Sequence, residues 1–134
     1  MSMVYAVMGL ALLQYLLFGI AVGAARGRYG VKAPATTGNE HFERYYRVQM
    51  NTLELLIVLV PALPLFAYYV SVRWAVVLGL AYVVGRFVYF YAYVKAPEKR
   101  GLGYVVSYVP VVGLGAAALA AFRGEAFRIG SSRM

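Results

Sequence analysis

Residues 46–72 read YRVQMNTLELLIVLVPALPLFAYYVSV and combine three polar groups with a long apolar run. Arg47, Asn51 and Glu54 stand at i, i+4 and i+7, so a helix presents all three on one face. Residues 55–72 contain no charged side chain, which is typical of the remainder of a membrane span. Because charges at bilayer depth are costly, they usually face a partner, a cavity or a ligand. The stretch therefore predicts a polar site inside a membrane protein.

The composition of the whole chain favours the same class. Of the 134 residues, 63% are hydrophobic and 13% are charged, whereas soluble domains carry about 25% charged residues. The chain has no cysteine and a single histidine, so we expect no disulfide and no metal site. The net charge of +8 would suggest nucleic acid in a soluble protein. Here the cations lie mostly at the ends of apolar segments, so we expect anionic lipid or an anionic ligand and no nucleic acid.

Four apolar segments are each close to the length of about 20 residues that spans a bilayer as a helix. We expect helices over residues 3–26, 41–70, 73–94 and 101–122, followed by a loose tail over 123–134. No Lys or Arg precedes the first segment, which favours a retained span over a cleaved signal peptide. The fold class is therefore all-α: a single domain, residues 1–134, that forms an integral membrane four-helix bundle with up-down topology.

The distribution of cations predicts how this multi-pass protein lies in its membrane. With four spans, the first and third connections share one side. That side holds six Lys and Arg, at positions 26, 28, 32, 95, 99 and 100, against four at positions 73, 123, 128 and 133 on the other. The positive-inside rule then places the first side in the cytoplasm and both termini outside. A bacterial inner membrane and the endoplasmic reticulum are both compatible with this pattern.

An up-down bundle brings several polar positions to one membrane face. Those nearest this face are Arg26, Arg47, Tyr93 and Arg100. The third helix adds a single stripe of polar groups, namely Tyr82, Arg86, Tyr89 and Tyr93. The pattern predicts a cationic pocket whose wall holds a carboxylate and phenols.

Simpler roles remain open for these residues. Tyrosines near span ends commonly form an aromatic belt, and Tyr89 and Tyr93 fit a belt as well as a site. Glu54 has an alternative role as the counter-ion of Arg47 or Arg86 inside the bundle. We interpret Arg86 as a structural counter-ion rather than a ligand contact.

Two motifs resemble a known family. Residues 42–54, FERYYRVQMNTLE, match the pattern F-E-R-x-x-R-x-Q-x-N-x-x-E of the MAPEG family of membrane-associated proteins in eicosanoid and glutathione metabolism. Residues 86–93, RFVYFYAY, followed by Arg100, resemble the third-helix pattern of one branch. That branch holds leukotriene C4 synthase and the type 2 and type 3 microsomal glutathione transferases. The resemblance covers nearly the whole chain.

The resemblance implies roles for matching positions. Members of this family are four-helix homotrimers that bind glutathione between neighbouring subunits. Arg47, Asn51 and Glu54 would hold the charged ends and backbone of the tripeptide, and Arg100, as the catalytic residue, would face its sulfur. The full set of implied glutathione-binding residues is Arg26, Arg47, Gln49, Asn51, Glu54, Tyr89 and Tyr93, with Arg26 and Gln49 acting from the neighbouring side.

The implied function is that of a membrane-bound glutathione S-transferase. It would conjugate glutathione, as an arginine-stabilised thiolate, to a lipophilic electrophile from the bilayer and would also reduce lipid hydroperoxides. Gly27 and Leu55 depart from the leukotriene synthase pattern, which argues against leukotriene synthesis specifically. Two alternatives remain: a non-enzymatic lipid-presenting member of the same family, and a small transporter or channel. The retained arginines and the Asn51–Glu54 pair favour the enzyme.

Overall fold

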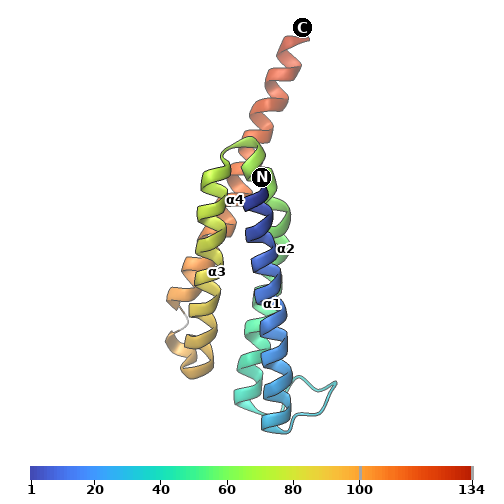
Figure 1. Ribbon diagram of the computed structural model, residues 1–134, viewed down its shortest axis with the longest axis vertical. Coiled ribbons are helices and arrows are strands. Elements are labelled where there is room, and N and C mark those ends of the chain that lie inside the picture. The colour runs from blue at the N-terminus through green and yellow to red at the C-terminus, as the bar shows by residue number, and fades with distance from the viewer. Residues whose placement is uncertain (100, 134) are drawn as a thin grey trace.

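The computed structural model describes residues 1–99 and 101–133, and these form an up-down bundle of four long helices (Figure 1). The elements in chain order are α1 (Ser2–Tyr29), α2 (Glu40–Tyr69), α3 (Val72–Lys95), the short 3₁₀ turn η1 (Pro97–Lys99) and α4 (Gly101–Ser132). All four long helices have the length and the apolar composition to cross a membrane. The prediction of an all-α four-helix bundle is thus confirmed, whereas trimerisation stays a prediction.

Side-chain caps set where α2 and α3 begin. The Asn39 Oδ1 atom accepts a hydrogen bond from the backbone N–H of Phe42 at 3.1 Å. The Ser71 Oγ atom accepts one from the N–H of Trp74 at 3.3 Å. Asparagine and serine are favoured at this position because their side chains satisfy N–H groups that lack partners within the helix. The loops therefore stop at these two residues.

The predicted end of the fourth helix at residue 122 is too early, because α4 continues to Ser132, and the looseness of the tail stays a prediction. Figure 1 shows these last turns projecting beyond the rest of the bundle. Residues 123–132 are polar but contain no proline, and Arg, Glu and Ala are good helix formers. The polar composition of residues 123–132 is typical of a helix end outside the hydrocarbon part of a bilayer. It does not interrupt the backbone hydrogen bonds of α4.

The closest helix contact lies between α3 and α4, at two glycines. A Cβ atom at Gly103 would lie 2.4 Å from the backbone nitrogen of Tyr89, and one at Gly85 would lie 2.7 Å from that of Ser107. Small residues let membrane helices approach in this way. The small residues at 113–118 of α4 are looser: a Cβ atom at Gly113 would meet nothing within 4 Å, and one at Gly115 would lie 3.9 Å from Cγ1 of Val58 on α2. The close approach thus lies at the end of α4 that carries Tyr104.

Candidate functional site

The polar stripe of α2 borders a pocket. Arg47, Asn51 and Glu54 all line a cavity of about 270 Å³ between α2 and the α1–α2 connection, which contributes Thr36 and Thr37. The side chains of Arg47 and Glu54 are exposed and that of Asn51 is half-buried. The helical spacing therefore places the three groups along one side of α2, as the sequence predicts.

A second cavity joins three helices. It has a volume of about 420 Å³ and is lined by Arg47 and Asn51 from α2, Tyr89 and Tyr93 from α3, and Gly101 and Tyr104 from α4. The Asn51 Nδ2 atom donates a hydrogen bond to the Tyr89 hydroxyl oxygen at 2.7 Å. The Tyr89 and Tyr93 rings lie 5.4 Å apart between centroids. This end of the bundle is the one that carries the α1–α2 and α3–α4 connections (Figure 1).

A third cavity, deeper along the same helices, contains Arg86. Its volume is about 280 Å³, and its lining comprises Asn51, Glu54, Leu55, Arg86, Tyr104 and Tyr108. The Arg86 side chain has no exposed surface, and its guanidinium lies 4.1 Å from the centroid of the Tyr89 ring. A cation at the centre of a membrane helix costs roughly 2.5–3.5 kcal/mol, and cation–π contact offsets only part of that. The predicted counter-ion role of Arg86 is untested, because no ion pair to it is recorded among residues 1–99 and 101–133.

Arg26 and Gln49 lie outside this cluster. Arg26 Nη1 donates to the carbonyl oxygen of Ala35 at 2.6 Å, and its guanidinium lies 4.7 Å from the Phe42 ring centroid. Gln49 faces α1, where a Cβ atom at Gly19 would lie 2.8 Å from Gln49 Nε2. Residues two apart on a helix do not share a face, so Gln49 lies away from the side that carries Arg47 and Asn51.

One chain therefore gathers only part of the predicted set. The residues brought together around the three cavities are Arg47, Asn51, Glu54, Tyr89 and Tyr93. Arg100, the predicted catalytic residue, lies outside the described residues. Its sequence neighbour Gly101 lines the same cavity as Arg47 and Tyr93.

The sequence interpretation missed Tyr104, which lines both the second and the third cavities. Its ring stacks on that of Tyr108, with centroids 5.2 Å apart and planes at 13°. The signal was present, since Gly101, Tyr104 and Tyr108 stand at i, i+3 and i+7 on α4. The same helical spacing that was considered on the second and third helices identifies these residues on the fourth.

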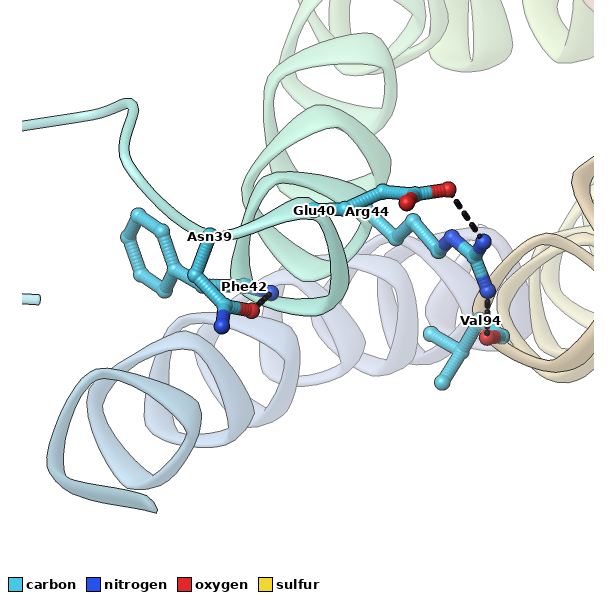
Figure 2. A network of polar contacts seen from close by, with 5 residues as sticks. All are labelled: Asn39, Glu40, Phe42, Arg44 and Val94. Atoms are coloured by element: carbon cyan, nitrogen blue, oxygen red, sulfur yellow. Dashed lines mark hydrogen bonds and ion pairs between the residues drawn. The ribbon is translucent and has the colours of Figure 1, made fainter. Parts of the chain in front are cut away.

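Arg44, a residue of the matched pattern, ties α2 to the end of α3. Figure 2 shows its guanidinium between Glu40 and Val94. The Nη2 atom pairs with the Glu40 Oε1 atom at 2.7 Å, and Nη1 donates to the Val94 carbonyl oxygen at 3.2 Å. Carbonyl groups in the last turn of a helix lack partners within that helix, so Arg44 satisfies one of them. The contact holds the end of α3, which carries Tyr93, against the first turns of α2.

Comparison with known proteins identifies the family. A sequence profile of the MAPEG family matches residues 4–120. An uncharacterized protein of Synechocystis sp. is 50% identical over 97 residues, which cover 72% of this chain and 71% of that protein. Human microsomal glutathione S-transferase 2 is 39% identical over 90 residues, covering 67% of this chain and 61% of the human protein. Leukotriene C4 synthase of Cavia porcellus is 34% identical over 83 residues, covering 62% and 55%. The chain belongs to the MAPEG family and is an integral membrane protein.

Proposed function

We propose that this protein is a membrane-bound glutathione S-transferase that conjugates glutathione to a lipophilic electrophile. The observation that carries the proposal is the cavity that Arg47, Asn51, Tyr89 and Tyr93 line together. Glutathione is a compact peptide with two carboxylates, one ammonium group and a thiol. A basic rim with an amide, phenols and one carboxylate behind it complements those groups. The similarity to microsomal glutathione S-transferase 2 supports the same proposal.

Arg47 and Glu54, the two charged groups of the α2 stripe, are complementary to a carboxylate and the ammonium group of glutathione. Arg47 is exposed beside two of the cavities and suits a carboxylate, because a guanidinium binds this group with two parallel hydrogen bonds. Glu54 lies seven residues further along α2, about 10 Å deeper at 1.5 Å per residue, and suits the ammonium. Asn51 lies between them and offers its amide oxygen to the peptide backbone.

Catalysis requires the thiolate, since a free thiol with a pKa near 8.5 is only slightly ionised at neutral pH. We assign the stabilising cation to Arg100. A guanidinium about 4 Å from the sulfur contributes roughly 4 kcal/mol at an effective dielectric constant of 20. At about 1.4 kcal/mol per pKa unit, this lowers the thiol pKa by about two to three before desolvation reduces the effect. Arginine suits the task because it keeps its charge in a partly dry site.

The thiolate then attacks the electrophilic carbon, a carbon–sulfur bond forms, and the leaving group departs with its electron pair. The electrophile enters from the bilayer, which concentrates apolar molecules around the helices. The same thiolate reduces a lipid hydroperoxide when a second glutathione completes the disulfide. That reaction yields one alcohol and one water for two glutathione molecules oxidised.

Arg26 and Gln49 would complete the site of a neighbouring subunit in a homotrimer. Neither residue lines the three cavities of its own chain, and the MAPEG resemblance implies binding between subunits. Their contribution is therefore expected only in the assembled protein.

Thermal unfolding of the detergent-solubilised protein tests the proposal. A ligand present at 100 times its dissociation constant stabilises the folded state by about 2.7 kcal/mol, so millimolar glutathione is expected to raise the melting temperature. An unchanged melting temperature would refute glutathione binding. Binding without turnover of a chlorodinitrobenzene-type electrophile or a lipid hydroperoxide would favour a lipid-presenting protein.

Replacing Arg47 with alanine is expected to weaken glutathione binding about 10-fold to 100-fold, because a hydrogen bond to a charged group contributes about 1.5–3 kcal/mol. Titration calorimetry measures the change. Arg73→Ala is the matched control, since Arg73 is an exposed arginine at the opposite end of the bundle. Equal affinities for Arg47→Ala and the unmodified protein would remove Arg47 from the site.

A further inference from the structure

Arg86 is a buried cation without a hydrogen-bond acceptor among the residues that the structure describes. None of its side-chain nitrogens, Nε, Nη1 or Nη2, has a partner there. The guanidinium lies over the face of the Tyr89 ring and near other tyrosines, and by hydrogen-bond geometry its N–H donors have no acceptor there. Because buried charges in proteins are usually paired, we expect an anion in the cavity beside Arg86.

Glu54 is the anion that the chain itself offers. The chain has five acidic residues, and Glu54 alone lines the cavity of Arg86. The others are distant along the chain: Glu40 and Glu43 in the first turn of α2, Glu98 in η1 and Glu125 near the end of α4. Within the described ranges the one recorded ion pair joins Arg44 to Glu40, which leaves Glu54 without a cation. Two opposite charges therefore share one small cavity and lack partners.

We propose that Arg86 is a positioning residue that pairs with Glu54 across this cavity and holds its carboxylate ready for the ammonium group of an α-amino acid. The proposal rests on the proposed function and adds a residue to it. A carboxylate accepts about four hydrogen bonds, so Glu54 can serve Arg86 and a ligand ammonium together. The cavities then present charges in the order Arg47 positive, Glu54 negative and Arg86 positive. A zwitterionic end such as the γ-glutamyl group of glutathione fits between the first two.

A purely structural role for Arg86 makes a different prediction. If the guanidinium only packs against Tyr89, its loss disturbs the cavity and weakens every ligand alike. If it holds Glu54, its loss weakens only ligands that carry the ammonium. An analogue in which a glutaryl group replaces the γ-glutamyl group lacks that amine and keeps the rest of the peptide, so it separates the two roles.

The experiment is calorimetric titration of the full-length protein in detergent with glutathione and with glutaryl-cysteinylglycine. Arg86→Gln is expected to weaken glutathione binding about tenfold or more and to change binding of the analogue by less than about threefold. In a Glu54→Gln background, Arg86→Gln is expected to change glutathione binding by less than about threefold. Arg73→Gln, on the exposed start of α3, is the control and is expected to leave both affinities unchanged. Equal weakening of both ligands, or independent effects of the two substitutions, would overturn the proposal.

A ligand-free measurement separates this proposal from the proposed function. Each single variant is expected to lower the melting temperature: Glu54→Gln by several degrees, because it leaves the buried guanidinium of Arg86 unpaired, and Arg86→Gln because it leaves the carboxylate of Glu54 without its cation. The double variant is expected to melt no lower than the less stable single variant. Additive losses of stability would refute the pair. If the effects of the two substitutions on stability are not additive but the protein binds neither peptide, the Arg86–Glu54 pair stands and the proposed glutathione site is refuted.

Discussion

Replacing Arg100 with alanine is expected to abolish the thiolate absorbance of bound glutathione while most of the binding persists. In the proposed site the peptide is held mainly through its charged ends, at Arg47 and Glu54, so loss of a cation at the sulfur should change ionisation more than affinity. Without about 4 kcal/mol of stabilisation the thiol returns toward its ordinary pKa near 8.5 and is mostly protonated at neutral pH. Ultraviolet difference spectra of the saturated protein measure the thiolate, and calorimetry on the same sample measures binding.

The control for Arg100→Ala is the adjacent cation. Lys99 is an exposed residue of η1, and Lys99→Ala removes one positive charge from the same turn. It is expected to preserve the thiolate signal. Arg100→Lys is expected to restore part of the signal, because an ammonium supplies charge without the planar geometry of a guanidinium. An undiminished signal in Arg100→Ala would contradict the assignment of catalysis to this residue.

Replacing Gly103 with alanine is expected to destabilise the protein and to weaken glutathione binding. The added Cβ would lie 2.4 Å from the nitrogen of Tyr89 and 2.6 Å from its Cα, and neither backbone atom can move alone. Overpacking of this kind costs about 1–3 kcal/mol and would push α4 away from α3. Tyr104 would move with α4, which opens the cavity that it shares with Tyr89. Thermal unfolding and calorimetric titration measure the two effects.

Gly113→Ala is the matched control on the same helix, because a Cβ atom there would meet nothing within 4 Å. Alanine is more favourable than glycine in a helix by about 1 kcal/mol, so this substitution is expected to leave stability unchanged or raise it. Opposite shifts in melting temperature for the two variants would demonstrate the backbone contact. A stabilised Gly103→Ala variant would show that α3 and α4 do not touch at this point.

The sequence predicted the helices because length and apolar composition are local properties. The predicted starts at residues 41 and 73 lie one residue inside the observed starts of α2 and α3, where Asn39 and Ser71 supply the caps. The stripe of Arg47, Asn51 and Glu54 followed from helical spacing alone, and the structure keeps it as one face. Periodicity within one element was therefore sufficient for this half of the site.

Properties that depend on two helices could not be obtained in the same way. Small residues at 113–118 and at Gly103 look equivalent in sequence, and only the rotation of α4 against α3 decides which of them meets a neighbouring backbone. The same rotation brings Tyr104 into the cavity. The end of α4 differs for another reason, since a polar composition alone does not end a helix.

The hydrogen bond between Asn51 and Tyr89 gives the cavity a fixed polarity. A phenol has one proton, and the Tyr89 oxygen already accepts from the Asn51 amide at 2.7 Å. The phenolic proton is then free to point toward the cavity that both residues line. Asn51, in turn, keeps its carbonyl oxygen as an acceptor. A peptide bond bound there as proposed would meet a donor from one helix and an acceptor from the other, which favours one orientation of the peptide.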